Sequence, residues 1–132
     1  MLSCVRAAKG RTVLLTHHQF LSEHHTIEGN LESKLRPVLQ GAGGIDAWFW
    51  GHEHICMRFP RRADVRYAAC TGHGSIPHRT GAAWSGPGGW EYDDGNHRRW
   101  CGYAVLDLKG ARIGVRYVDQ QGNEHHPESL PA

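Results

Sequence analysis

Two short apolar runs that both end in histidine constrain the fold of this 132-residue chain more than any other feature. The first run, residues 13–15, is followed after one threonine by His17. The second, residues 45–50, is followed after Gly51 by His52. Continuous apolar runs of this length are typical of strands buried on both faces of a sheet. The sequence therefore predicts two buried strands that each carry an imidazole at the carboxyl end.

The segment between these runs has the pattern of an amphipathic helix. It places apolar residues at i, i+4, i+7 and i+8, namely Leu31, Leu35, Val38 and Leu39. Asn30 precedes them as an expected N-cap, and Pro37 predicts a kink or a break. Strand, helix and strand over roughly forty residues is the size of one βαβ unit. Its two strands are parallel, so we expect His17 and His52 to meet at one edge of the sheet.

A third histidine lies close to this expected meeting point. His54 follows His52 by two residues, and positions i and i+2 of an extended chain point to the same side. Three imidazoles suit Zn, Mn or Fe. His18 is expected to point the other way, so that only one histidine of the pair at 17–18 enters the site. The sequence thus predicts a metal site of His17, His52 and His54, with metal-free loop histidines as the alternative reading of an HxH pattern.

The remainder of the chain predicts further strands. Residues 65–70 form a third apolar run, and residues 103–108 and 113–118 alternate around a Lys-Gly turn as in a β-hairpin. A long stretch at 75–99 is rich in Gly, Pro and Trp, which is usual for functional or irregular loops. The polar tail 120–132 is expected to be frayed. We expect one domain over residues 1–119, followed by that tail.

Composition excludes several classes of protein. Net charge is only +2 and no long Lys or Arg run occurs, so nucleic acid is not indicated as a partner. No window approaches the roughly 20 apolar residues that a membrane span needs, and the N-terminus is a poor signal peptide. The four cysteines are widely spaced, which indicates reduced thiols and a cytoplasmic location. The sequence carries no signal for a particular oligomeric state.

Two segments resemble the last two signature blocks of the calcineurin-like metallophosphoesterases: LLTHHQ at 14–19 and WFWGHEH at 48–54. The resemblance implies an α/β fold, part of a four-layer αββα sandwich with a mixed sheet that ends in a β-hairpin. It implies hydrolysis of phosphomonoesters or phosphodiesters by two divalent metal ions (Mn, Fe, Zn or Ni). His17 and His52 would bind the second metal and His54 the first. His73, in CTGHGSI at 70–76, would be a substrate-side candidate, against the alternative of a surface turn histidine.

The earlier blocks of that family, a DxH, a GDxxD and a GNH followed by an acid, are missing. Residues 95–97 spell GNH, but they lie after GHEH and continue with Arg98, so we interpret them as a coincidence. We therefore expect the C-terminal half of a catalytic domain, with Met1 as a late start and no catalytic residue retained. Three neutral histidines without a bridging carboxylate should bind metal weakly and hydrolyse little.

A second function stays open at this point. The histidines could hold one structural zinc in a non-catalytic domain, and Cys56 or Cys70 would then have to complete the site. Glu53, between the ligand histidines, is expected to point away from them and either to support those ligands or to lie at the surface, rather than to bind the metal.

Overall fold

The computed structural model describes residues 9–22, 31–39, 44–61, 64–76 and 101–130. Within these ranges the chain is mostly β-strand, arranged in two sheets, with one short helix. Nearly all of the stretch 75–99, including its GNH triplet and its tryptophans, lies outside the described residues. In the described ranges no helix has the length and apolar character to cross a membrane.

The first sheet has four strands in the order β1-β2-β4-β3. Three of them, β1, β2 and β4, are parallel, and β3 runs antiparallel to β4. Their bounds are Val13–Thr16 for β1, Ile45–Trp50 for β2, Cys56–Phe59 for β3 and Val65–Thr71 for β4. The predicted βαβ unit and third strand are thus confirmed. Strand β3 was not predicted, because its four residues are too few to show a periodic pattern.

Helix α2, Leu31–Leu39, is the crossover between β1 and β2. Leu31, Leu35 and Leu39 pack into a cluster with Phe20 and the Trp48 side of the sheet. Pro37 lies in the last turn and is exposed, and the helix continues past it to Leu39. The expected break does not occur, because a proline this close to the C-terminal end leaves most helical hydrogen bonds intact.

The second sheet is antiparallel in the order β5-β6-β7, with bounds Gly102–Lys109, Arg112–Asp119 and Glu124–Leu130. The predicted hairpin is confirmed by β5 and β6. The prediction of a frayed tail is wrong, because β7 occupies most of it. Asp119 organises the turn into β7 by accepting hydrogen bonds from the backbone N–H groups of Gln121 (2.8 Å) and Asn123 (2.9 Å). Its carboxylate also lies 2.8 Å from Nε2 of His125 on β7.

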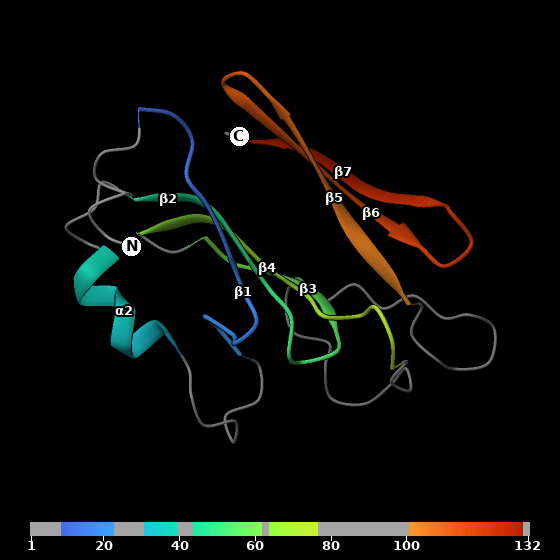
Figure 1. Cartoon of the computed structure of the whole chain (residues 1–132), viewed down its shortest axis with the longest axis horizontal. Coiled ribbons are helices and arrows are strands. Elements are labelled where there is room, and N and C mark those ends of the chain that lie inside the picture. Colours follow the sequence, from blue (N-terminus) through green and yellow to red (C-terminus); the bar gives the residue numbers. More distant parts are fainter. Residues whose placement is uncertain (1–8, 23–30, 40–43, 62–63, 77–100, 131–132) are drawn as a thin grey trace.

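The central strands of the first sheet, β2 and β4, are largely buried on both faces, which explains why they read as apolar runs. One face carries Trp48 and Trp50 toward the cluster that includes α2. The other face carries Ala47, Phe49 and Tyr67 into a cluster with the second sheet, here called the inter-sheet core. The second sheet contributes Ile113, Val115, Tyr117 and Leu130 to that core. Figure 1 shows α2 and the β5–β7 sheet flanking the first sheet.

Candidate metal centre

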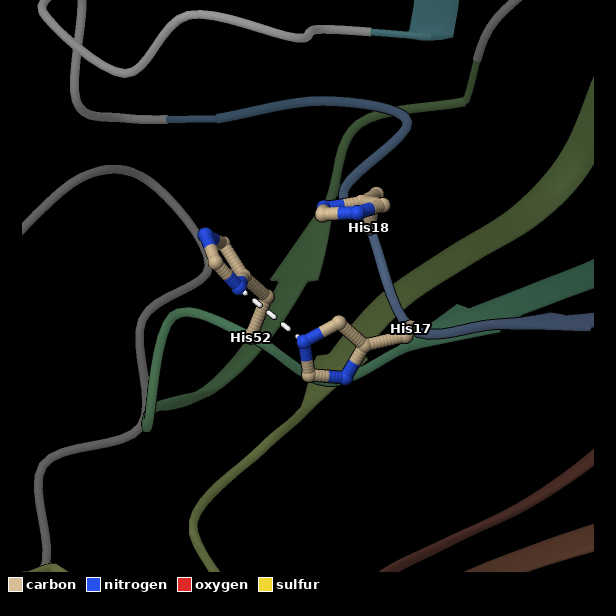
Figure 2. A group of neighbouring side chains, drawn as sticks. All are labelled: His17, His18 and His52. Carbon is tan, nitrogen blue, oxygen red and sulfur yellow. Dashed lines mark hydrogen bonds between the residues drawn. The ribbon is translucent and has the colours of Figure 1, made fainter.

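The register of β1 and β2 brings the first two histidines together. Thr16 and Trp50 are the last residues of these parallel strands, and they are paired with each other. The chains that leave them therefore emerge side by side at one edge of the sheet. Nε2 of His17 lies 3.1 Å from Nδ1 of His52. The expected proximity of His17 and His52 is confirmed, and Figure 2 shows the two rings turned toward each other.

His18 completes a group of three. Each of His17, His18 and His52 offers a ring nitrogen, and these nitrogens all lie within 4.8 Å of one another. The ring centroids are 5.0 to 5.2 Å apart and the rings meet edge to face. All three side chains are exposed. The prediction that only one histidine of the pair enters the site is wrong, because the backbone bends at 17–18 instead of continuing as an extended strand.

A buried indole fixes that bend. Nε1 of Trp48 donates a hydrogen bond to the Thr16 hydroxyl at 2.9 Å, and the Thr16 hydroxyl donates to the His18 carbonyl at 2.8 Å. Trp48 is fully buried, so this chain of two hydrogen bonds connects the core of the sheet to the backbone that carries the histidines. Packed residues of the sheet thus fix the backbone of the site, although its imidazoles are exposed to solvent.

His54 lies outside the group of three histidines. The segment 51–54 is not extended: His52 has φ of 61° and His54 has φ of 41°, and the Glu53 N–H donates to the Gly51 carbonyl at 2.7 Å. The rule that residues i and i+2 share a side applies only to extended chains, so it does not hold across this turn. Left-handed backbone at two histidines that are separated by a single residue is uncommon, and such backbone is often found at functional sites.

Glu53 is buried beneath this turn rather than exposed, so a surface role is excluded. Its side chain accepts a hydrogen bond from the Ser22 hydroxyl. Ser22 follows β1 and its histidines, whereas Glu53 follows β2, so this bond ties together the two segments that present His17, His18 and His52. Glu53 therefore supports the segments that carry the imidazoles, and it does not belong to the group of possible metal ligands.

His73 occupies a separate place. It lies in the turn after β4, is buried, and lines a small cavity with Cys56, Cys101 and Tyr117. Burial lowers the pKa of His73, so its imidazole is held neutral. The alternative of a surface turn histidine is therefore wrong. His73 is also outside the group of His17, His18 and His52.

The cysteines that a structural zinc would need are not in the site either. Burial raises the pKa of the Cys70 thiol to about 12, and the thiol donates to the Gly51 carbonyl at 3.3 Å. Burial also raises the pKa of Cys56, so both thiols are protonated near neutral pH. Thiolates bind zinc, whereas neutral thiols bind it poorly. Within the described residues the candidate ligands are thus three imidazoles, with no thiolate or carboxylate among them.

Comparison with known proteins supports the fold but not a family. No family model matches the sequence, and no curated protein matches it. A solved structure described as "GAP50 the anchor in the inner membrane complex of Plasmodium" is similar, with a TM-score of 0.67 and 18% identity over 98% of this chain. This chain spans 39% of the length of that chain.

The identification from residues 14–19 and 48–54 therefore needs correction. Neither a family model nor a curated protein supports membership of the calcineurin-like metallophosphoesterases, and the similar solved structure is named as an anchor. At 18% identity the likeness establishes the shared fold and nothing more. Two short blocks without the earlier ones were too little sequence to identify a family, because His-containing loops after strands also arise independently.

The turn that holds His52 depends on Gly72. A Cβ at this position would lie 3.0 Å from the backbone carbon of Gly51 and 3.0 Å from the backbone nitrogen of His54. Gly72→Ala is therefore expected to displace the turn, to cost about 1–3 kcal/mol of stability and to weaken metal binding by several-fold. Urea denaturation and a metal titration measure the two effects.

Gly74→Ala is the matched control, because its Cβ would meet only the Gly102 carbonyl oxygen at an ordinary 3.7 Å. If Gly72→Ala behaves like Gly74→Ala in both measurements, the turn does not depend on this close approach.

Proposed function

We propose that this chain binds one divalent transition-metal ion, such as Zn, Mn, Fe or Ni, through His17, His18 and His52. The observation that carries the proposal is the convergence of three ring nitrogens within 4.8 Å, from the ends of two neighbouring parallel strands. One ion replaces the two that the sequence led us to expect, since His54 is not part of the group.

The spacing of the imidazoles supports this proposal. Zinc–nitrogen bonds of about 2.0–2.1 Å in a tetrahedron place ligand nitrogens about 3.3 Å apart. Nε2 of His17 and Nδ1 of His52 are already 3.1 Å apart. Because the three side chains are exposed, small rotations of the rings can complete the geometry without disturbing the core. Three protein ligands also leave the fourth position open, as in catalytic rather than structural zinc sites.

The charge of such a site favours an anionic ligand. Neutral imidazoles leave the charge of the ion uncompensated, and no carboxylate belongs to the described group. A phosphate ester has oxygen atoms that suit the open position and a charge that balances the ion. We therefore propose phosphate esters as the substrate class and their hydrolysis as a second candidate activity. This hydrolysis should be weak or undetectable in this chain alone, because the site would hold one metal ion without the second ion of a two-metal site.

A finer fold proposal accompanies the function. A four-layer αββα sandwich has a helical layer outside each of two packed sheets. In this chain helix α2 packs against one face of the first sheet, and the second sheet shares a buried core with the other face. We propose that this chain is part of such a sandwich. The similarity over 39% of a longer solved chain supports this proposal.

Isothermal titration with Zn²⁺ or Ni²⁺ tests the metal proposal. The chain is expected to bind one ion, and His17→Ala, His18→Ala and His52→Ala should each raise Kd at least about tenfold, because each change removes a ligand. His54→Ala is the matched control and should change Kd much less. Affinity should fall at acidic pH, since protons compete with the ion for imidazole nitrogen.

Equal losses of metal affinity in His54→Ala and His52→Ala would instead favour the ligand set predicted from the sequence, namely His17, His52 and His54. A structural zinc would give a different result: chelation would unfold the protein. An ion bound at the exposed site proposed here is not needed for folding, so addition of a chelator should leave the circular dichroism spectrum unchanged.

Turnover of bis(p-nitrophenyl) phosphate with Mn²⁺ tests the hydrolytic candidate. We expect either a slow, metal-dependent release of nitrophenol that disappears in His52→Ala, or no release above that variant. Because a single ion cannot activate water and also stabilise the leaving oxygen as two ions do, fast turnover would contradict the account. If His52→Ala kept the slow rate, the activity could not be assigned to this site.

A further inference from the structure

A second cluster of reactive side chains lies apart from the three histidines, around the small cavity beside His73. The cavity lies at the end of the inter-sheet core, and both sheets contribute to its walls. Its lining includes Cys56, His73, Cys101, Tyr117, Asp119 and His125. The space inside is about 10 Å³, which is enough for one water molecule. The cavity therefore suits a small polar ligand, with two thiols and two imidazoles around it.

One atom of this lining lacks a partner. Nδ1 of His73 is buried and makes no hydrogen bond to the described residues, and His73 as a whole is only 8% exposed. A buried nitrogen without a partner is rare, and it often marks bound water or a chemical role. Burial lowers the pKa of His73, and a nearby Thr71 backbone group raises it by less. The ring is therefore neutral, and Nδ1 is available to accept a proton.

The backbone places Cys101 beside this imidazole. The Gly102 N–H donates to the His73 carbonyl at 3.0 Å, and a Cβ at Gly102 would lie 3.0 Å from Nε2 of His73. The His73 ring thus lies against the residue that follows Cys101. The Cys101 N–H donates to Oε1 of Gln120 at 2.9 Å. Hydrogen bonds therefore hold the backbone that carries the Cys101 thiol at two successive residues.

Cys101 differs from the other described cysteines in exposure. Its side chain is partly exposed, whereas Cys56 and Cys70 are buried. Burial raises the pKa of both buried thiols, that of Cys70 to about 12, so both are protonated and unreactive. A small reagent from solvent therefore reaches Cys101 more readily than either of them.

The other polar groups of the lining already have partners. The Tyr117 hydroxyl lies 2.8 Å from the Tyr67 hydroxyl, and burial raises the pKa of Tyr117, so that it stays neutral. The Asp119 carboxylate accepts two backbone hydrogen bonds and lies 2.8 Å from Nε2 of His125. Among the described lining residues, His73 is therefore the best placed to take a proton from the Cys101 thiol.

We propose that Cys101 is a site of oxidation by hydrogen peroxide and that His73 is the base that activates its thiol. Nδ1 of His73 takes the thiol proton, and the thiolate sulfur attacks one peroxide oxygen. The O–O bond breaks as the S–O bond forms, and the departing hydroxide takes the proton from His73 and leaves as water. Sulfur loses two electrons to the peroxide, and the products are Cys101 sulfenic acid and water.

The cavity favours peroxide over larger oxidants. Hydrogen peroxide is close to water in size, and it both donates and accepts hydrogen bonds, as a ligand next to Nδ1 of His73 should. This site shares no residue with the metal site proposed above, so either proposal can fail without the other.

Trapping with dimedone, followed by peptide mass spectrometry, tests the proposal. The parent chain carries Cys4→Ser, because Cys4 lies outside the described residues, and a chelator removes any metal. After peroxide treatment near pH 7, dimedone is expected on Cys101 and not on Cys56 or Cys70. A disulfide between Cys101 and Cys56 counts as the same result, because it forms from the sulfenic acid with loss of water.

Two variants test the base. His73→Gln should slow the oxidation of Cys101 at least about tenfold near pH 7, because general bases contribute about 10²–10⁴-fold. His125→Gln changes the other imidazole of the lining and is the matched control, with a much smaller expected loss.

The pH profile distinguishes a base from a structural support. A variant that only loosened the cavity would change the rate at every pH. Loss of a base matters only while the thiol is protonated, so the rates of His73→Gln and its parent should converge at about pH 10, above the ordinary thiol pKa of about 8.5.

Three results would each overturn the proposal. The first is a native chain in which peroxide leaves Cys101 unmodified or modifies Cys70 equally fast. The second is a rate in His73→Gln that equals that of the parent near pH 7, or that stays as far below it at pH 10. The third is a larger loss in His125→Gln than in His73→Gln.

Discussion

The parallel pairing of β1 with β2 is the interaction on which the rest of the structure depends. With Val13 opposite Ala47 and Thr16 opposite Trp50, one register determines both the burial of the strands and the place where their histidines emerge. A slip by one residue would turn the side chains of β1 to opposite faces and would separate His17 from His52. Burial of Trp48 and Trp50 opposes such a slip, since both indoles are almost completely enclosed. The candidate site is therefore a consequence of the core.

The site combines a rigid base with exposed ligands. Trp48 and Thr16 hold the backbone of the first two histidines, while Gly72 and the Ser22–Glu53 hydrogen bond hold the turn of the third. Strained backbone at His52 is maintained by these packed neighbours.

Much of this arrangement could be predicted from the sequence, because apolar runs and helical periodicity report burial directly. The strands before His17 and His52, the helix from Leu31 and the hairpin of β5 and β6 all have such patterns. Strand β7 lacks one, since it is polar and depends on a turn built by Asp119. The entry of His18 and the absence of His54 from the site were missed for one reason: both follow from bends and positive φ angles after the strands, where the alternation of an extended chain no longer applies.

X-ray absorption spectroscopy of the protein loaded with one equivalent of Zn²⁺ tests the central claim most directly, because it counts and identifies the ligand atoms. The account predicts three imidazole nitrogens at about 2.0–2.1 Å, with oxygen from water in the remaining position and no sulfur. Loss of one imidazole shell in His18→Ala would assign the ligand that the sequence did not predict. A sulfur shell at about 2.3 Å, or fewer than three imidazoles, would contradict the account.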